Sequence, residues 1–264
     1  MGSTEKNHIF TSPQGFGIGC LQFHFDNYAY LLACGKEAAV IDPGDAVPVR
    51  NYLQSHGLEI AHILCTHHHL DHVGGVRALK EQYGCTVWGP DDGRIPSLDR
   101  TLSDGDVMSF GALSLRAISV PGHTRSHLAY YMEKEGLLFS GDCLFLGGCG
   151  RIFEGTAGQM HASLQKLARL PDSTFVFPGH EYTEENLMFA LSLEPGNDAV
   201  SGHLKRVQEL RRLGSPTVPG TISVEKVTNP FLRIHEPQLS KALHLEGRTD
   251  VELFGAIRRL KDRF

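Results

Sequence analysis

Short apolar runs rich in β-branched and aromatic residues alternate with segments of helical periodicity along the first two-thirds of the chain. Runs bounded by turn residues predict strands, and they lie at Cys20–Phe25, Tyr28–Ala33, Ala38–Ile41, Ile60–Cys65, Thr86–Trp88, Leu113–Val120, His127–Met132, Leu137–Phe139 and Phe175–Phe177. Apolar residues three to four positions apart predict helices at Ala46–His56, Gly75–Tyr83 and Gln159–Leu170. Strands interleaved with helices indicate a layered, mixed α/β domain.

The pattern becomes helical after His180. Periodic apolar residues predict four further helices, at Glu184–Leu193, Asn197–Leu213, Gln238–Leu243 and Asp250–Arg263. A long connection separates the second from the third, and it contains Pro216, Pro219, Gly220 and Pro230. We therefore expect two domains, the first at residues 1–181 and a smaller helical one at residues 182–264.

The composition is that of a folded globular chain. Apolar residues make up 41% of the 264 positions, and 29 glycines bring the sum into the usual range. The net charge of −5 provides no basic field for nucleic acid or anionic lipid. No apolar stretch approaches the roughly 18–20 residues of a membrane span. We therefore expect neither nucleic acid nor a membrane as a partner.

The N-terminus and the cysteines bear on the cellular compartment. The first ten residues have neither the apolar core of a signal peptide nor the arginine-rich pattern of a transit peptide. The six cysteines contain no CxxC pair, which favours reduced thiols. We expect a cytoplasmic monomer, with a mitochondrial location left open.

A dense string of candidate metal ligands, THHHLDH at Thr66–His72, follows one of the predicted strands. Residues two apart in an extended segment point to the same side, so His67 and His69 can chelate a single ion. Asp71 and His72 are adjacent to each other, face elsewhere and can serve a second ion.

Three further candidate ligands, His123, Asp142 and His180, each follow a glycine that comes after an apolar stretch. Together with the string they make seven nitrogen and carboxylate ligands, which is the set that a two-metal hydrolytic centre requires. Ligands of this type suit zinc, but also iron or manganese, so ligand chemistry alone does not choose the ion.

These motifs resemble a known family. The stretch THHHLDHVGG at Thr66–Gly75, with PGH, SGD and PGH downstream, resembles the metallo-β-lactamase superfamily. Within that superfamily, GCGRIFEGTA at Gly148–Ala157 and PGHEYT at Pro178–Thr183 are similar to glyoxalase II, the hydroxyacylglutathione hydrolases. The similarity runs from about Cys20 to the C-terminal KDRF.

The resemblance implies an αββα sandwich with the metals at one edge, followed by a helical domain. It also implies two metal ions per chain, for which we expect zinc, with iron or manganese left open. The first ion would be bound by His67, His69 and His123. The second would be bound by Asp71, His72 and His180, with Asp142 bridging both ions. His68, inside the string, is expected to point away from the ions.

Cationic residues near the metal motifs suggest how a substrate is bound. Taken alone, a basic helix end such as Arg258–Lys261 only complements the helix dipole. The resemblance implies instead that Arg258 and Lys261 bind the glycine end of glutathione, with Tyr182 and Arg151 nearer the thioester. The chain departs from the animal form of the family at two positions, with Arg151 in place of lysine and Phe153 in place of tyrosine. Phe153 lacks the hydroxyl that could form a hydrogen bond.

The expected reaction is hydrolysis of S-(2-hydroxyacyl)glutathione, notably S-D-lactoylglutathione, to glutathione and D-lactate, as the second step of methylglyoxal removal. Two ions about 3.5–4 Å apart can share a hydroxide, and our hypothesis is that this hydroxide is the nucleophile. Two dications, two aspartates and a hydroxide leave the site at about +1, which suits a carbonyl oxygen that gains charge. Asp71 is a candidate for holding the hydroxide. No G-x-S-x-G motif indicates a serine nucleophile.

Three other functions compete with this interpretation. A glutathione persulfide dioxygenase would use a single iron on the same scaffold, and the longer helical C-terminus argues against it. The acidic balance argues against a nuclease or a lactonase of the superfamily. In a non-enzymatic binding or regulatory module the metals would only stabilise the fold, but each ion of a structural site is usually fully coordinated by four protein ligands. Seven ligands for two ions leave positions open for chemistry.

Overall fold

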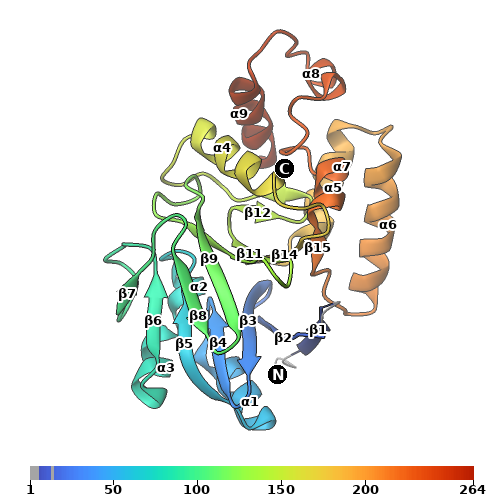
Figure 1. The fold of residues 1–264 in the computed structure, drawn as a ribbon. Helices are drawn as coiled ribbons and strands as arrows, with labels where there is room; N and C mark the ends of the chain where they lie inside the picture. The colour runs from blue at the N-terminus through green and yellow to red at the C-terminus, as the bar shows by residue number, and fades with distance from the viewer. Residues whose placement is uncertain (1–5, 13–14) are drawn as a thin grey trace. The chain divides into compact units, whose positions relative to one another are not determined.

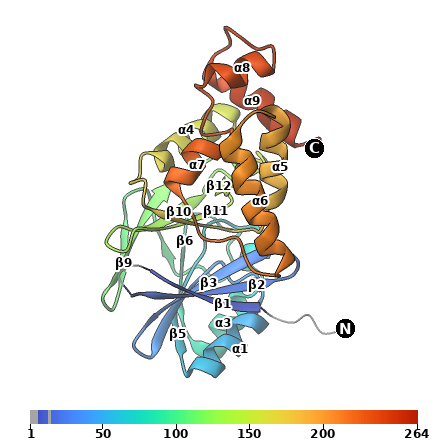
Figure 2. The ribbon, with the colours of Figure 1, turned by 90° about the vertical axis from the view of Figure 1, so that its right-hand side faces the viewer.

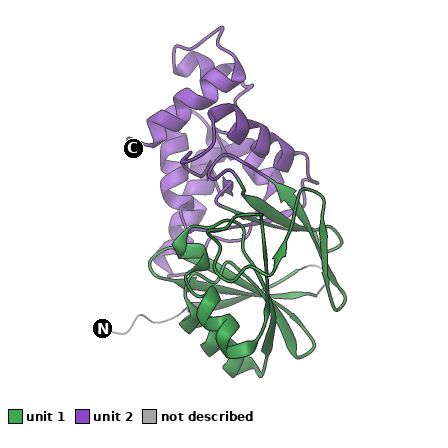
Figure 3. Ribbon diagram, turned by 90° about the vertical axis from the view of Figure 1, so that its left-hand side faces the viewer, with its two compact units in different colours: residues 1–119, 126–141 green, residues 120–125, 142–264 purple. Residues whose placement is uncertain are grey.

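The computed structural model describes residues 6–12 and 15–264. It contains two compact units (Figure 3). Unit 1 comprises residues 1–119 and 126–141, and unit 2 comprises residues 120–125 and 142–264. Among the described residues, no helix has both the length and the apolar character needed to cross a membrane. The expected domain boundary near residue 181 stays a prediction.

A seven-stranded sheet forms one layer of unit 1 (Figure 1). Its strands follow in chain order: β1 (Lys6–Thr11), β2 (Gly17–Phe23), β3 (Asn27–Cys34), β4 (Glu37–Ile41), β5 (Glu59–Leu64), β6 (Thr86–Gly89) and β7 (Arg100–Thr101). Strands β1 to β4 pair antiparallel, whereas β4 to β7 pair parallel. The connection from β4 to β5 contains α1 (Ala46–His56), and the next contains α2 (Leu70–Val73) and α3 (Val76–Tyr83). The parallel strands β4 and β5 therefore end at the same edge of the sheet.

Successive side chains along each strand of this sheet point to opposite faces, so the buried residues lie on both faces. Leu31 and Val40 pack with Val49 of α1 and Leu79 of α3. The neighbouring Tyr30, which is also buried, turns to the opposite face because side chains alternate along a strand. The helices thus cover one face and leave the other for a second sheet.

Unit 1 contributes four antiparallel strands to a second sheet. They are β8 (Val107–Phe110), β9 (Leu113–Ser119), β10 (Leu128–Met132) and β11 (Leu137–Gly141), each paired with the next. The rings of Tyr30 in the first sheet and Phe139 in the second have centroids 5.4 Å apart. The hydroxyl of Tyr130 donates to the carbonyl oxygen of Cys65, just after β5, at 2.7 Å. Unit 1 therefore has its layers in the order helix, sheet, sheet.

Unit 2 is mainly helical. Its elements are β12 (Leu144–Phe145), β13 (Gly148–Cys149), α4 (Ala157–Ala168), β14 (Phe175–Pro178), α5 (Thr183–Leu193), α6 (Asp198–Arg212), β15 (Gly220–Thr221), α7 (Ile222–Thr228), α8 (Pro237–Ala242) and α9 (Asp250–Lys261). Helices α5 and α6 lie side by side (Figure 2) and share a buried cluster that includes Leu187, Ala190 and Val200. Helix α9 begins with a capping box formed by Thr249 and Glu252.

The mixed α/β layers and the helical C-terminal region agree with the sequence prediction, with element ends shifted by a few residues. The pattern does not indicate β1, β8 or α7. Strand β8 alternates exposed and buried residues over only four positions, which is too short for a clear period. Helix α7 lies inside the proline-containing connection. Its β-branched residues disfavour helix, but Thr221 caps it by accepting from the N–H of Val224.

Glu225 of α7 gives unit 2 a pH-dependent stability. The side chain is fully buried, and burial raises the pKa of its carboxyl to about 7, although hydrogen bonds from Asn229 and from the N–H of Gly147 oppose this rise. The pKa in the folded state exceeds the ordinary value of 4.5. The free energy of unfolding should therefore fall as the pH rises between these two values and then level off.

We expect Glu225→Gln, which has no proton to lose, to remove this decline. The stability of the variant relative to the wild type should increase by up to about 3 kcal/mol between about pH 5 and about pH 8. Urea denaturation at a series of pH values measures this difference. The exposed Glu246→Gln serves as the control. Parallel pH profiles for Glu225→Gln and the wild type would contradict the prediction.

Candidate metal centre

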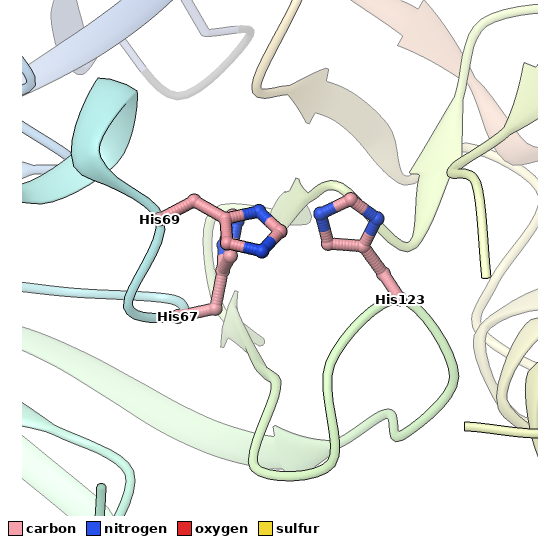
Figure 4. Close-up of side chains that lie close together, drawn as sticks. All are labelled: His67, His69 and His123. Carbon is pink, nitrogen blue, oxygen red and sulfur yellow. The ribbon is translucent and has the colours of Figure 1, made fainter. Parts of the chain in front are cut away.

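The THHHLDH string follows β5 at the point where the chain leaves the sheet. His69 is extended (φ −61°, ψ 142°), and α2 begins at the next residue. The rings of His67 and His69 lie beside each other with centroids 4.6 Å apart (Figure 4). The His72 ring lies 4.2 Å from that of His67. Unit 1 thus gathers on one loop the ligands predicted from the string.

A buried carboxylate at the end of β4 orients this loop. Asp42 accepts hydrogen bonds from the N–H and the hydroxyl of Thr66, both at 2.7 Å, and from Nδ1 of His72 at 2.9 Å. Because Nδ1 of His72 carries the proton, its Nε2 keeps the lone pair that a metal requires. The Thr66 hydroxyl gives its proton to Asp42 and so accepts from Nδ1 of His67 at 3.0 Å. Nε2 is therefore the candidate ligand atom of His67 as well.

The sequence analysis missed Asp42. Its carboxylate and the nitrogens of His67 and His72 lie within 4.8 Å of one another, as a group that could hold an ion. The oxygens of Asp42 already accept three hydrogen bonds, so we assign it to orienting the histidines. The sequence feature that could have indicated Asp42 is its position, as an acidic residue directly after a buried strand that ends at Ile41.

Asp71 has a fixed orientation beside His72. Its Oδ2 accepts from Nδ2 of Asn27 at 2.9 Å and lies 3.6 Å from Nε2 of His72. A Cβ at Gly44 would lie 1.8 Å from the carbonyl oxygen of Asp71, so only glycine allows the turn after β4 to pack this closely. The carboxylate and the imidazole thus point toward a common space.

His68 contacts a different carboxylate. Its Nδ1 lies 3.4 Å from Oδ2 of Asp92. Hydrogen bonds from Arg94, with a further one from Ser126, hold the pKa of Asp92 well below its usual range, so this carboxylate remains charged. The position of His68 suits the structural role expected for it.

Three predicted ligands come together in unit 2. His123 lies on the loop at residues 120–125 (Figure 4), Asp142 follows β11 and His180 follows β14. Oδ2 of Asp142 lies 3.5 Å from Nε2 of His123 and 3.3 Å from Nε2 of His180. Both separations exceed an ordinary N–H···O hydrogen bond. All three residues are buried, so a carboxylate and two imidazoles converge away from bulk water.

Main-chain groups fix this second set of ligands. Nδ1 of His123 donates to the carbonyl oxygen of Arg151 at 2.8 Å, which leaves Nε2 available as a ligand atom. A Cβ at Gly150 would lie 1.9 Å from the carbonyl oxygen of Asp142, so the chain can pass over Asp142 only with glycine here. Imidazole and carboxylate donors without thiolate suit zinc, iron or manganese. The residues of both units therefore fit a metal cofactor.

Aromatic side chains surround the ligands of unit 2. The rings of His180 and Tyr182 stack with centroids 4.8 Å apart, and Phe145 meets both of them edge-on. Phe153 is 59% exposed, and its ring meets that of His123 edge-on at 5.2 Å. This exposed apolar surface lies next to the candidate metal-binding residues, and it suits contact with the uncharged part of a small molecule.

The three cations predicted to bind substrate differ in their surroundings. The side chain of Arg151 is 59% exposed, and its Nε lies 3.4 Å from Oδ1 of Asp262. Lys261 forms an ion pair with Glu185 of α5, whose side chain is 63% exposed. Arg258 is buried, and its Nη2 lies 3.1 Å from the same oxygen of Asp262. Arg151 can meet a ligand directly, whereas the side chains of Arg258 and Lys261 are each only 8% exposed.

Two family models match the chain in succession. The metallo-beta-lactamase superfamily model matches residues 24–180, and the model of the hydroxyacylglutathione hydrolase C-terminus matches residues 181–264. The matched ranges include every candidate ligand and every predicted substrate-binding residue.

Several proteins are similar over nearly the whole chain. The hydroxyacylglutathione hydrolase of Chromohalobacter salexigens is 49% identical over 244 residues, which are 90% of this chain and 96% of that protein. The hydroxyacylglutathione hydrolase of Methylococcus capsulatus is also 49% identical, over 90% of this chain and 95% of that protein. That of Rhodospirillum rubrum is 46% identical over 90% of this chain and 95% of that protein.

Solved structures share the fold at lower identity. A protein named TTHA1623, solved in a di-iron-bound form, is 28% identical with a TM-score of 0.57 over 78% of this chain and 95% of that chain. ETHE1 from Myxococcus xanthus is 24% identical with a TM-score of 0.62 over 96% of both chains. The predicted fold class is confirmed by these matches together with the superfamily model.

We expect Asp42→Asn to weaken metal binding by about 10- to 100-fold, because His72 loses the charged acceptor that holds its ring. Equilibrium dialysis against buffered Zn²⁺, followed by elemental analysis, measures the affinity. Asp99→Asn is a matched control, since Asp99 also accepts a backbone N–H, from Val87, in the same sheet. Equal affinities for Asp42→Asn and the wild type would contradict the orienting role.

Proposed function

Because the chain belongs to the hydroxyacylglutathione hydrolases of the metallo-β-lactamase superfamily, we propose that it hydrolyses S-(2-hydroxyacyl)glutathione thioesters. The substrate would be S-D-lactoylglutathione, with glutathione and D-lactate as products. The observation that carries this proposal is the 46–49% identity to hydroxyacylglutathione hydrolases over about nine-tenths of the chain. The resemblance inferred from the sequence motifs is thereby confirmed.

We propose that the two sets of ligands form one binuclear centre. His67, His69 and His123 would bind the first ion. Asp71, His72 and His180 would bind the second, with Asp142 shared between them. The support is that acceptors of the protein hold Nδ1 of His67, His72 and His123, so that Nε2 of each ring is the candidate ligand atom. Zinc is the ion we propose, with iron or manganese as alternatives that the same donors accept.

The chain's own residues would prepare water and substrate for the reaction. When bound, metal ions supply an activated water and positive charge for the carbonyl oxygen. Asn27 donates to the Asp71 carboxylate and fixes its orientation, so that Asp71 would orient a water molecule and take part in moving its proton.

The proposed substrate site lies in unit 2. The glycine end of glutathione would be bound by Arg258 and Lys261, with Tyr182 and Arg151 nearer the thioester and Phe153 beside them. Glu185, the present partner of Lys261, is 63% exposed and can give way to a substrate carboxylate. The guanidinium of Arg151 offers a fork for two parallel hydrogen bonds. Arg258 belongs to the same proposed set, and its buried guanidinium also donates to the carbonyl oxygen of Cys149 at 2.7 Å.

The persulfide dioxygenase alternative has weaker support. The ETHE1 structure shares only the fold at 24% identity, whereas the hydroxyacylglutathione hydrolases reach 49%. A dioxygenase with one iron would also leave the ligands proposed for a second ion without a use.

We further propose that the enzyme acts as a cytoplasmic monomer, with mitochondria as an alternative location. All six cysteines are free thiols and five of them are buried, which suits a reducing compartment.

The wild-type protein should release glutathione from S-D-lactoylglutathione and contain close to two metal ions per chain. His69→Ala should lower kcat by at least about 100-fold and lose metal, because one imidazole of the chelating pair is absent. Thiol release and elemental analysis give both results. The surface variant His235→Ala is the control, since that side chain is 66% exposed. A single iron and no thioester hydrolysis would contradict the proposal.

Lys261→Ala should raise KM by roughly tenfold, equivalent to about 1.4 kcal/mol, and change kcat much less. The reason is that its ammonium group binds a carboxylate far from the scissile bond. Lys205→Ala, an exposed lysine on α6, should leave both constants unchanged. Steady-state kinetics test the prediction, and an unaltered KM for Lys261→Ala would remove this residue from the substrate site.

A further inference from the structure

The start of β10 is tied to the loop of unit 1 that carries the THHHLDH string. The N–H of Leu128, the first residue of this strand, donates to the carbonyl oxygen of Thr66 at 2.9 Å. Two residues earlier, the hydroxyl of Ser126 donates to Oδ2 of Asp92 at 2.6 Å. Both neighbours of His127 in the chain are therefore held by hydrogen bonds, and the backbone of His127 has a fixed place beside the candidate ligands.

His127 lies on the flat face of one of these ligands. Its imidazole stacks on that of His67, with ring centroids 4.8 Å apart and planes 19° from parallel. Both residues are fully buried. In the part of the chain that the structure describes, the groups that could hold an ion include His67 but not His127. We therefore consider His127 as a support for the ligand and not as a ligand.

Gly141 packs against the same imidazole. Its φ is +50°, and a Cβ at this position would lie 2.8 Å from Cε1 of His127 and 2.6 Å from the hydroxyl oxygen of Thr66. Only glycine allows an approach this close with this backbone conformation. With Gly141 against its edge and His67 against its face, the His127 ring has little room to change its orientation.

A hydrogen bond alone does not fix the plane of an imidazole. The Thr66 hydroxyl accepts from Nδ1 of His67 at 3.0 Å, which sets the position of one ring atom. The ring torsion χ2 of histidine has broad minima, so the plane can still tilt about this bond. The face of His127 limits this tilt and, with it, the direction in which Nε2 of His67 points.

We propose that His127 is a positioning residue, which sets the plane of the His67 ring and so directs its Nε2 toward the metal ion. The proposal rests on the ligand role proposed for His67, and it does not depend on the identity of the substrate. It divides the support of one ligand between two side chains: Thr66 holds Nδ1, and His127 holds the plane.

The experiment compares His127→Ala with His127→Phe in the full-length protein. Alanine removes the ring, whereas phenylalanine keeps a flat ring without the nitrogens. His62→Ala is the control, because it removes an imidazole from the same unit that meets the rings of Trp88 and Phe110. Three quantities are measured: the Zn²⁺ affinity by competition with a chelator, the visible spectrum of the Co²⁺-substituted protein, and the melting temperature. The spectrum reports ligand geometry, which a loss of stability alone does not change.

His127→Ala should weaken Zn²⁺ binding by about 10-fold and alter the Co²⁺ spectrum, because a partner that orients a metal ligand typically contributes at least this much. His127→Phe should keep the wild-type spectrum and most of the affinity. His62→Ala should change the melting temperature only. The proposal is overturned if His127→Ala keeps the affinity and spectrum of the wild type. It is also overturned if a folded His127→Phe is as defective as His127→Ala, since the ring nitrogens would then carry the effect.

His127→Gln covers the case in which the alanine variant does not fold. Its amide keeps a donor and an acceptor but has no ring, so it should lose affinity and change the spectrum as alanine would. Wild-type values in this variant would overturn the proposal. If the wild type binds Zn²⁺ but does not hydrolyse the thioester, the proposed function fails, and affinity and spectrum still decide the role of His127. A wild type without Zn²⁺ affinity would overturn both.

Discussion

The candidate metal centre depends on acceptors that hold one nitrogen of each imidazole and leave the other for an ion. Asp42 does this for His72, and through the Thr66 hydroxyl for His67. The carbonyl oxygen of Arg151 does it for His123. Because the acceptors lie at strand ends or on short loops, they fix the orientation of each ring. The rest of the fold can be understood as what keeps these acceptors in place: parallel β4 and β5 bring Asp42 to the string, and the helical region fixes the segment that carries Arg151.

The fold was predictable where burial leaves a regular pattern. Strand β3 and helix α1 are long, buried on one side or both, and bounded by turn residues, so their period is clear. Strand β8 and helix α7 are short, and tertiary contacts stabilise them more than their own propensity does. The resemblance to a family, rather than periodicity, indicated how the layers are ordered.

The site was predictable to a different degree. The seven candidate ligands stand in sequence motifs, and each unit brings its own members together. Asp42, Asn27 and the bonds of Arg258 could not be found this way, because they act through orientation and their partners are 24 to 109 residues away. A basic helix end looks the same in sequence whether its arginine faces solvent or a buried carbonyl. The side chains of Arg258 and Lys261 are equally covered, so only their partner atoms distinguish them: a main-chain carbonyl and Asp262 for Arg258, and Glu185 for Lys261.

The three hydrogen bonds of Asp42 also bear on how the protein acquires its ions. Thr66 and His72 satisfy this carboxylate by themselves, so the ligand loop can reach its shape during folding without waiting for an ion. Donors that are already oriented lose less conformational freedom when an ion binds, so the hydrogen bonds of Asp42 favour metal affinity.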